Sequence, residues 1–264
     1  GISITYQNQS NVDSSGNMNT MYLDSSNYEI QQYNCDRPGE GQLIFVGKNY
    51  CIGSQTIPIR VVGDLKNVEV INVNDQYDYT GKQIKPTPIV QFGSQVLEEG
   101  EDYTIEYGNN VDVGTNSGSI VIRQVSGTDT YYTGAKTARF NIYYNLSKAT
   151  VTGLNDTYSY TGSEVKPIPQ VTCAGKVLQK GVDYSLTYTN NIDAGTASVV
   201  INSIDGASIG NQVVNFEIKG INLEDPGMNI TLDGQSSGTT ATYTGDYIQP
   251  KVVVTYGGKT LTQT

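Results

Sequence analysis

The chain has 264 residues, with 26 acidic and 16 basic side chains and a net charge of −10. Nucleic-acid binding needs a basic footprint, so this charge argues against a nucleic-acid partner. There is no histidine, which removes the commonest general base and metal ligand. No apolar run approaches the roughly 18 residues of a membrane span. We therefore expect a non-enzymatic protein segment without a cofactor or a membrane span.

A Tyr-Thr-Gly tripeptide occurs three times, at residues 79–81, 160–162 and 243–245, with starts 81 and 83 residues apart. Each copy is followed by a proline and then a leucine at fixed spacing: Pro86, Pro167 and Pro250, then Leu97, Leu178 and Leu261. A fixed internal period of this kind indicates a repeat array. The glycine of each tripeptide is expected to supply a turn with positive φ.

A second block follows the first two tripeptides. It contains Asp-Tyr at 102–103 and 183–184, an Asn pair at 109–110 and 190–191, and Gly-Thr at 114–115 and 195–196. Short alternating runs between turn residues predict about seven strands per unit. The sequence has no sustained 3.6-residue period, so we expect almost no helix. In the first complete unit the strands are expected near residues 68–71, 76–79, 88–92, 95–97, 103–107, 119–125 and 138–143.

The order of these blocks resembles the immunoglobulin-like repeats of large Gram-positive cell-surface proteins, clostridial ones especially. The resemblance is good over residues 65–220 and partial on both sides. It implies an all-β fold of tandem immunoglobulin-like β-sandwich repeats of about 80 residues. It also implies an extracellular, cell-surface stalk, adhesin or filament segment with no active site.

Four segments are expected from the repeat. Residues 65–145 and 146–220 are complete units, residues 1–64 are the C-terminal half of a unit, and residues 221–264 are the N-terminal half of another. Residues 3–6 align with 104–107, and residues 50–53 align with 131–134. This alignment leaves an insertion at about residues 13–40 in the first half-unit.

The insertion is the main candidate for ligand binding. Long loops in compact domains are usually functional or disordered. Its Met and Tyr side chains could form an interface or a carbohydrate- or protein-binding loop: Met18, Met21, Tyr22, Tyr28 and Tyr33. Alternatively, the insertion is a decorated loop held by a disulfide between Cys35 and Cys51, which would contribute roughly 2–3 kcal/mol. The third cysteine, Cys173, is expected to be a small core residue.

Other recurring groups of residues give weaker evidence for a functional site. Recurrent aspartates could suit calcium, but Asp beside Asn and Gly is ordinary turn chemistry; they are Asp102, Asp112, Asp183 and Asp193. A glycosidase-like carboxylate pair has no support in the repeat pattern. Lysines recur at Lys85 and Lys166 and asparagines at Asn110 and Asn191, a pattern that could allow a covalent Lys–Asn link. In the third copy Gln249 takes the lysine position, which argues against this link. Asn8, Asn145, Asn155 and Asn229 begin N-x-[ST] glycosylation acceptors.

The core is predicted from two-residue spacing along strands. We expect Val90, Val171 and Val254 to be buried, with Phe92, Cys173 and Tyr256 on the same strand faces.

The two half-units are complementary pieces of one unit. Leu97 precedes Tyr107 by ten residues, and placing Gly1 after Thr264 gives nine residues from Leu261 to Tyr6. Either the chain is a window of a longer polypeptide of such repeats, or copies complete each other head to tail, as in strand-complemented fibres. The residues expected in such a completion are Ile2, Ile4, Tyr6, Val252, Val254, Tyr256 and Leu261.

Overall fold

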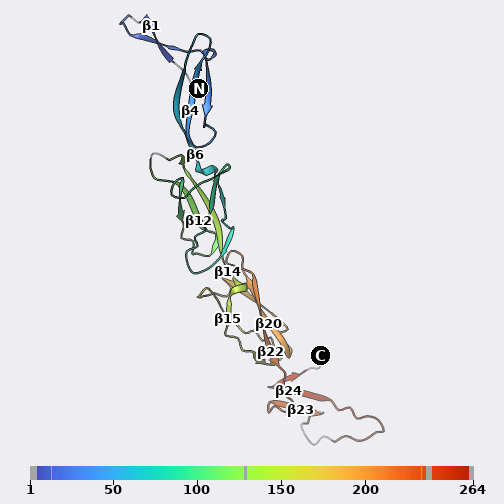
Figure 1. Cartoon of the computed structure of the whole chain (residues 1–264). Helices are drawn as coiled ribbons and strands as arrows, with labels where there is room; N and C mark the ends of the chain where they lie inside the picture. Colours follow the sequence, from blue (N-terminus) through green and yellow to red (C-terminus); the bar gives the residue numbers. More distant parts are fainter. Residues whose placement is uncertain (1–4, 13, 128–129, 233, 236–239, 262–264) are drawn as a thin grey trace. The chain divides into compact units, whose positions relative to one another are not determined.

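The computed structural model describes residues 5–12, 14–127, 130–232, 234–235 and 240–261. Its described segments are strands, turns and three single 3-10 turns: η1 (Ser25–Asn27), η2 (Leu65–Asn67) and η3 (Leu146–Lys148). The predicted all-β fold is therefore confirmed (Figure 1). In this described part of the chain, no helix is long and apolar enough to cross a membrane.

The chain divides into two compact units. The first contains residues Gly1–Asn74, Lys85–Gly108 and Ser119–Arg139, and the second contains Asp75–Ile84, Asn109–Gly118 and Phe140–Thr264. Residues 65–145 contribute to both units, because the long strands β12 (Gly114–Gln124) and β14 (Ala135–Asn145) each run through both.

The first unit contains short antiparallel sheets and one parallel pair. A hairpin joins β1 (Thr5–Val12) to β2 (Met18–Tyr22). The N-terminal half-sheet has the order β3 (Tyr28–Tyr33), β4 (Gly39–Gly47), β5 (Ser54–Val61). A second sheet has the order β7 (Glu69–Ile71), β9 (Ile89–Phe92), β10 (Gln95–Val96). β6 (Gly63–Asp64) pairs in parallel with β13 (Tyr132–Thr133), and β11 (Tyr103–Tyr107) pairs with β12.

The second unit is also built of short sheets. One sheet has the order β15 (Thr150–Thr152), β17 (Gln170–Cys173), β18 (Lys176–Val177). Another has the order β16 (Thr157–Ser159), β22 (Asn211–Lys219), β20 (Gly195–Ser203), β19 (Tyr184–Thr189). The C-terminal half-sheet comprises β23 (Met228–Leu232), β24 (Val252–Tyr256) and β25 (Lys259–Leu261). β8 (Gln76–Asp78) and β21 (Ser208–Ile209) each pair in parallel with β14.

The structure corrects the alignment of the first 64 residues. On β3 and β4, Tyr28 pairs with Gly47 and Ile30 with Phe45. The same register pairs Tyr103 with Gln124 and Ile105 with Ile122 in β11 and β12. Tyr28 is therefore the counterpart of Tyr103, and the alignment of residues 3–6 with 104–107 is wrong. Residues 13–40 are not one inserted loop either, because they contain β2, η1 and β3.

The core follows the alternation of side chains along the strands. Val90 and Val171 are fully buried and Cys173 is buried, as predicted. Phe92 is half-buried and packs edge-on against Tyr132, with ring centroids 5.6 Å apart. The expected third copy differs, because Val254 and Tyr256 are only half-buried in the C-terminal half-sheet.

Gly118 gives a test of packing in the second unit. A methyl group built on this buried residue would overlap the ring of Phe140. We expect Gly118→Val to lower the free energy of unfolding by about 1–3 kcal/mol, because the ring has to leave a closely packed position. Urea denaturation measures the change. Thr104→Ala, at an exposed position on β11, serves as the control. Equal stability of the glycine and valine variants would contradict this packing.

Candidate functional site

The two sequence blocks of each repeat are joined by side-chain hydrogen bonds to backbone carbonyls. The Tyr107 hydroxyl donates to the Pro86 carbonyl oxygen at 2.9 Å, and the Tyr188 hydroxyl donates to the Pro167 carbonyl oxygen at 2.8 Å. The proline that follows each Tyr-Thr-Gly tripeptide is thus tied to a tyrosine of the second block. The turn glycines of the three tripeptides have φ values of 73°, 67° and 99°, as predicted.

The recurrent asparagines hold the same two blocks together. The Asn110 side-chain amide donates to the Ile84 carbonyl oxygen at 3.0 Å, and that of Asn191 donates to the Val165 carbonyl oxygen at 3.1 Å. Both asparagines are buried. A buried amide that is hydrogen-bonded to backbone is a structural device.

The lysines considered for a covalent link lie elsewhere. Lys85 lies over the ring of Tyr107, and Lys166 forms an ion pair with Glu164 at 2.6 Å. The structure therefore gives these lysines and the buried asparagines separate roles.

The recurrent aspartates close turns. The carboxylate of Asp102 accepts from the backbone N–H of Glu98 at 2.9 Å, and that of Asp183 accepts from the N–H of Gln179 at 2.7 Å. Each donor directly follows a buried leucine of the first block, Leu97 or Leu178. Asp112 accepts from the Asn109 amide at 2.6 Å. No group of three or more His, Cys, Asp or Glu residues in the described chain is arranged to hold a metal ion.

Two joints between successive repeats have the same local structure. Asp64 accepts from the N–H of Lys66 at 3.0 Å, and Asn145 accepts from the N–H of Ser147 at 3.2 Å. Each cap starts a 3-10 turn whose first residue, Leu65 or Leu146, is fully buried. The last strand of one repeat therefore continues directly into the core of the next.

A short parallel bridge fixes each joint. Gly63 and Asp64 pair with Tyr132 and Thr133, and the Gly63 N–H donates to the Tyr131 carbonyl at 2.9 Å. At the second joint, Tyr144 and Asn145 pair with the two residues of β21, and the Tyr144 N–H donates to the Ala207 carbonyl at 3.1 Å. Neither bridge was predicted from the sequence, although the Asp-Leu and Asn-Leu pairs, 81 residues apart, indicate equivalent positions in successive repeats.

The second joint also carries a polar clamp. Asp78 accepts from the Asn145 amide at 3.1 and 3.2 Å and from Lys148 at 2.7 Å. Burial is the largest single influence on the pKa of Asp78, and it raises this pKa because it favours the neutral carboxyl. The hydrogen bonds from Lys148 and Asn145 and the charge of Lys148 together outweigh burial, so the pKa of Asp78 is lowered. Tyr79 packs edge-on against Tyr144, with centroids 5.0 Å apart.

One hydrophobic cluster spans this joint. It is made of residues from both sides: Tyr144, Leu146, Ala149, Val171, Cys173, Leu178, Tyr184 and Ile201, with Tyr79 and Val113 packed against it. Burial raises the pKa of the Cys173 thiol, and the carboxylates of Asp78 and Asp183 raise it further. Cys173 is thus a small core residue, as predicted.

The predicted disulfide is wrong. Cys35 and Cys51 are both free thiols. The Cys35 sulfur lies beside Gly41, whereas the backbone of Cys51 lies beside Gly47 at the other end of β4. An extended strand rises about 3.3 Å per residue, so six residues of β4 separate the two cysteines by roughly 20 Å.

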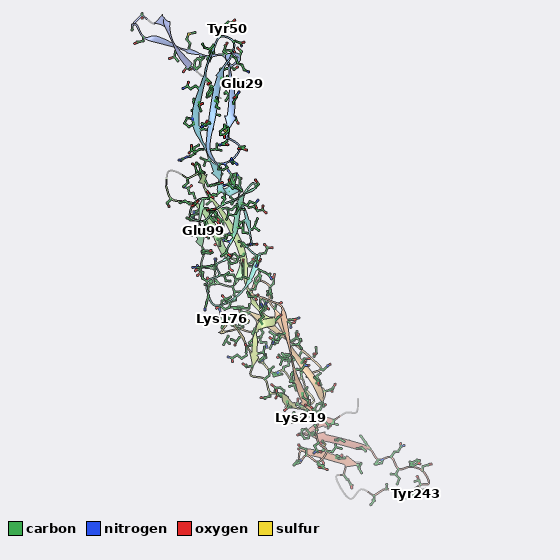
Figure 2. The ribbon with its side chains drawn as sticks, in the orientation of Figure 1. Glu29, Tyr50, Glu99, Lys176, Lys219 and Tyr243 are labelled. Atoms are coloured by element: carbon green, nitrogen blue, oxygen red, sulfur yellow. The ribbon has the colours of Figure 1, made fainter. Side chains whose placement is uncertain are left out.

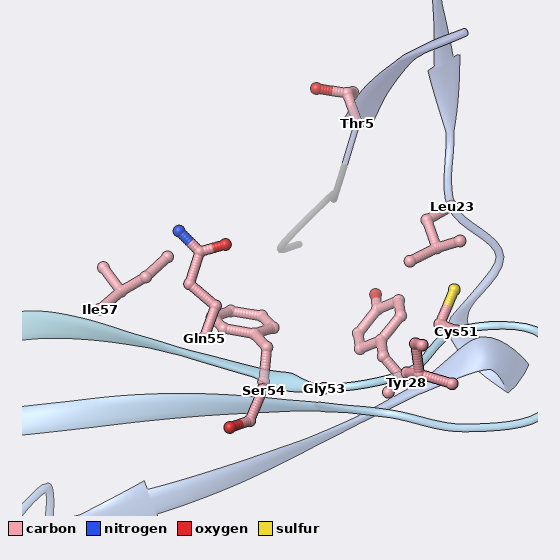
Figure 3. Close-up of a pocket in the computed structure, with 11 residues that line it drawn as sticks. Thr5, Leu23, Tyr28, Cys51, Gly53, Ser54, Gln55 and Ile57 are labelled. Carbon is pink, nitrogen blue, oxygen red and sulfur yellow. The ribbon is translucent and has the colours of Figure 1, made fainter.

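The residues proposed for a binding loop do not form one surface. Met18, Met21 and Tyr22 belong to β2, whereas Tyr28 and Tyr33 begin and end β3. Tyr22 and Tyr33 are 76% and 60% exposed. Tyr28 is half-buried against Phe45 and lines a cavity of about 540 Å³ on the N-terminal half-sheet (Figure 3).

The residues predicted to complete a neighbouring copy are only partly described. Ile2 and Ile4 lie outside the described residues, and Tyr6 is described by its backbone on β1. On the C-terminal half-sheet, Val252 is 56% exposed, and Val254, Tyr256 and Leu261 are half-buried.

The sugar acceptors have separate surroundings. The Asn145 side chain accepts a hydrogen bond from the Ser147 N–H at the second joint, whereas Asn155 and Asn229 are exposed. Asn8 is described by its backbone alone.

Comparison with known proteins finds no family model that matches the chain and no curated protein that matches it.

Removing one hydroxyl tests the link between the blocks. We expect Tyr188→Phe to lower the free energy of unfolding by about 0.5–1.5 kcal/mol, because the Pro167 carbonyl loses its donor. Chemical denaturation measures the loss. Tyr243→Phe is the matched control, because Tyr243 is 77% exposed (Figure 2). The same loss in both variants would mean that the hydroxyl bond contributes nothing specific.

The Asp78 clamp makes the second joint sensitive to acid. A carboxyl whose pKa is depressed on folding contributes stability above its unfolded pKa of about 3.9, and that stability is lost as pH falls through the folded value. We expect Asp78→Asn to cost up to about 1 kcal/mol at neutral pH and nothing in acid. Urea denaturation across the acid range, with exposed Asp205→Asn as control, measures the difference. A cost that is independent of pH would contradict this role.

Proposed function

We propose that this chain is a non-enzymatic structural segment of an extracellular stalk, adhesin or filament, built from tandem immunoglobulin-like sandwiches of about 80 residues. The observation that carries the proposal is the recurrent joint. At residues 63–65 and 144–146, the last strand of one repeat ends in a capped turn whose leucine is buried in the next repeat. Such a joint couples neighbouring repeats, and a protein that transmits force along its length needs that coupling.

The shared cluster at the second joint supports the same role. Small domains bury only about 60–65% of their unfolded surface, so each is modestly stable alone. Leu146 follows β14 yet packs with Val171 and Ile201 of the following segment. In a linear array, such nearest-neighbour contacts add stability to each repeat.

The surface chemistry agrees with a secreted, solvated array. The net charge of −10 keeps repeats from associating side to side without specific contacts. The extracellular location rests on the resemblance of the repeats to Gram-positive surface proteins.

The alternative is a carbohydrate- or protein-binding module that uses residues 13–40. Its aromatic residues are divided between β2 and β3. Because Tyr28 takes the place that the buried Tyr103 and Tyr184 take in the complete repeats, its role as a ligand contact has less support than the structural role.

Stretching a single chain by its two ends tests the structural role. We expect the complete repeats to unfold in discrete steps, each adding on the order of 25 nm of contour length for about 80 residues. Leu146→Ala should lower the force of these steps, because it removes a buried side chain that usually contributes about 2–5 kcal/mol. Exposed Leu223→Ala is the matched control.

Gradual extension without steps would contradict the structural role. Reproducible binding on a glycan array, lost on Tyr22→Ala and Tyr33→Ala, would support the binding module instead. These point changes are preferable to deleting residues 13–40, which would remove β3.

A further inference from the structure

The two joints carry residues of opposite size at equivalent positions. In the parallel bridge of the first joint Gly63 pairs with Tyr132, and in that of the second joint Tyr144 pairs with Ser208. Gly63 and Tyr144 lie at the end of the preceding repeat, whereas Tyr132 and Ser208 belong to the following one. The large side chain therefore comes from the following repeat at the first joint and from the preceding repeat at the second.

The first joint has no room for a side chain at residue 63. A Cβ atom built on Gly63 would lie 2.9 Å from the Cδ1 atom of the Tyr132 ring and 2.9 Å from the Cγ atom of Pro38. Tyr132 is 2% exposed, and its ring packs edge-on against Phe92. The rings of Tyr132 and Phe92 thus fill the space beside the backbone of Gly63.

The second joint fills the equivalent space from the preceding repeat. Tyr144 is buried in the shared cluster with Cys173, which ends β17 as Phe92 ends β9. The amine of Lys176, labelled in Figure 2, lies 5.5 Å from the centre of the Tyr144 ring. The residues of the following repeat that correspond to the two rings of the first joint, Cys173 and Ser208, are both small.

Ser208 and Tyr132 also differ in their hydrogen bonds. The Ser208 hydroxyl donates to the Asp183 carbonyl at 2.6 Å and accepts from the Ile204 N–H at 3.0 Å. The Tyr132 hydroxyl is buried and has no partner among the described residues. Tyr132 therefore contributes by filling space, whereas Ser208 closes a turn of its own repeat.

The residue before each of these shows the same exchange. The Tyr131 hydroxyl donates to the Glu40 carboxylate of the preceding sheet at 3.1 Å, and the Arg60 guanidinium lies 5.7 Å from the centre of the Tyr131 ring. At the second joint Ala207 takes this position, and the additional tyrosine, Tyr143, lies on the preceding strand instead.

We propose that this exchange makes the joints selective, so that the end of each repeat fits only a following repeat whose side chains have the complementary size. The proposal rests on the structural role given above and names what decides which repeats can be neighbours. Tyr144 opposite a residue like Tyr132 would place a Cβ atom and a ring in the same space. Gly63 opposite a residue like Ser208 would leave a cavity.

Such selectivity is useful in an array of similar units. Misassembly between domains and domain swapping are characteristic failures of repeat proteins. Specificity requires that a wrong partner be penalised as well as the right one favoured. Overlap in one wrong pairing and a cavity in the other would therefore favour the pairing of repeats that are adjacent in the chain.

Exchanging the large side chain at the second joint tests the proposal with the full chain. Tyr144→Gly alone should raise the equilibrium constant of unfolding by about tenfold or more, because it leaves a cavity. Cys173→Phe with Ser208→Tyr should raise it as well, because two large side chains then meet Tyr144. Adding Tyr144→Gly to these two changes reproduces the sizes of the first joint, so it should lower the constant again. Urea denaturation measures each constant, and hydrogen exchange assigns the change to residues 146–220.

This reversal of sign is the result that size matching requires. Tyr158→Gly is the matched control, because Tyr158 packs against Phe216 in another hydrophobic cluster of the same repeat. The control should destabilise both backgrounds equally. The same loss from Tyr144→Gly in both backgrounds would overturn the proposal. A Cys173→Phe/Ser208→Tyr chain as stable as the unchanged one would overturn it too.

A milder background keeps the test decisive if the chain with both larger side chains does not fold. Cys173→Phe alone retains the two hydrogen bonds of the Ser208 hydroxyl. The increase in the unfolding constant caused by Tyr144→Gly should be smaller by about threefold or more in this background, because the added ring fills part of the space that the tyrosine leaves. Equal increases in the two backgrounds would contradict size matching. Such a chain, if it still unfolds stepwise under force, would leave the structural role intact.

Discussion

The burial of a leucine directly after the last strand of a repeat is the contact on which the arrangement of the second unit depends. Leu146 follows β14 without a linker and lies in a cluster with Val171, Cys173 and Ile201. The Asn145 cap supplies an acceptor for the turn, so the chain can leave a strand and enter a core without an unpaired N–H. The residue that ends one repeat therefore contributes to the hydrophobic core of the next.

The small size of each repeat explains why certain residue types recur. Each small repeat must hold two blocks together with few side chains, and it does so with tyrosine hydroxyls and buried asparagine amides that donate to backbone carbonyls. Tyrosine suits this position because its ring packs in the core while its hydroxyl reaches a polar partner. Aspartate closes the turn between the blocks, which accounts for the Asp-Tyr pairs without a metal ion.

The two half-sheets differ from the complete repeats in the burial of several side chains. The N-terminal half-sheet has the strands of a second block, and the buried side-chain oxygen of Asn27 has no hydrogen-bond partner among the described residues. The C-terminal half-sheet has the strands of a first block, with Leu223 exposed and Val254 only half-buried.

The sequence by itself determined the all-β class, the approximate strand positions in the first complete repeat, the turn glycines and the burial of Val90 and Val171, because each depends on local spacing or backbone preference. It misplaced the first strand of the N-terminal half-sheet and joined Cys35 to Cys51, because strand pairing and the distance along β4 are not local properties. Only the tertiary structure decided the joints. The parallel bridges pair residues such as Gly63 and Tyr132 that are far apart in the chain. The periodicity of a sequence does not indicate which strand edges will pair over such a separation.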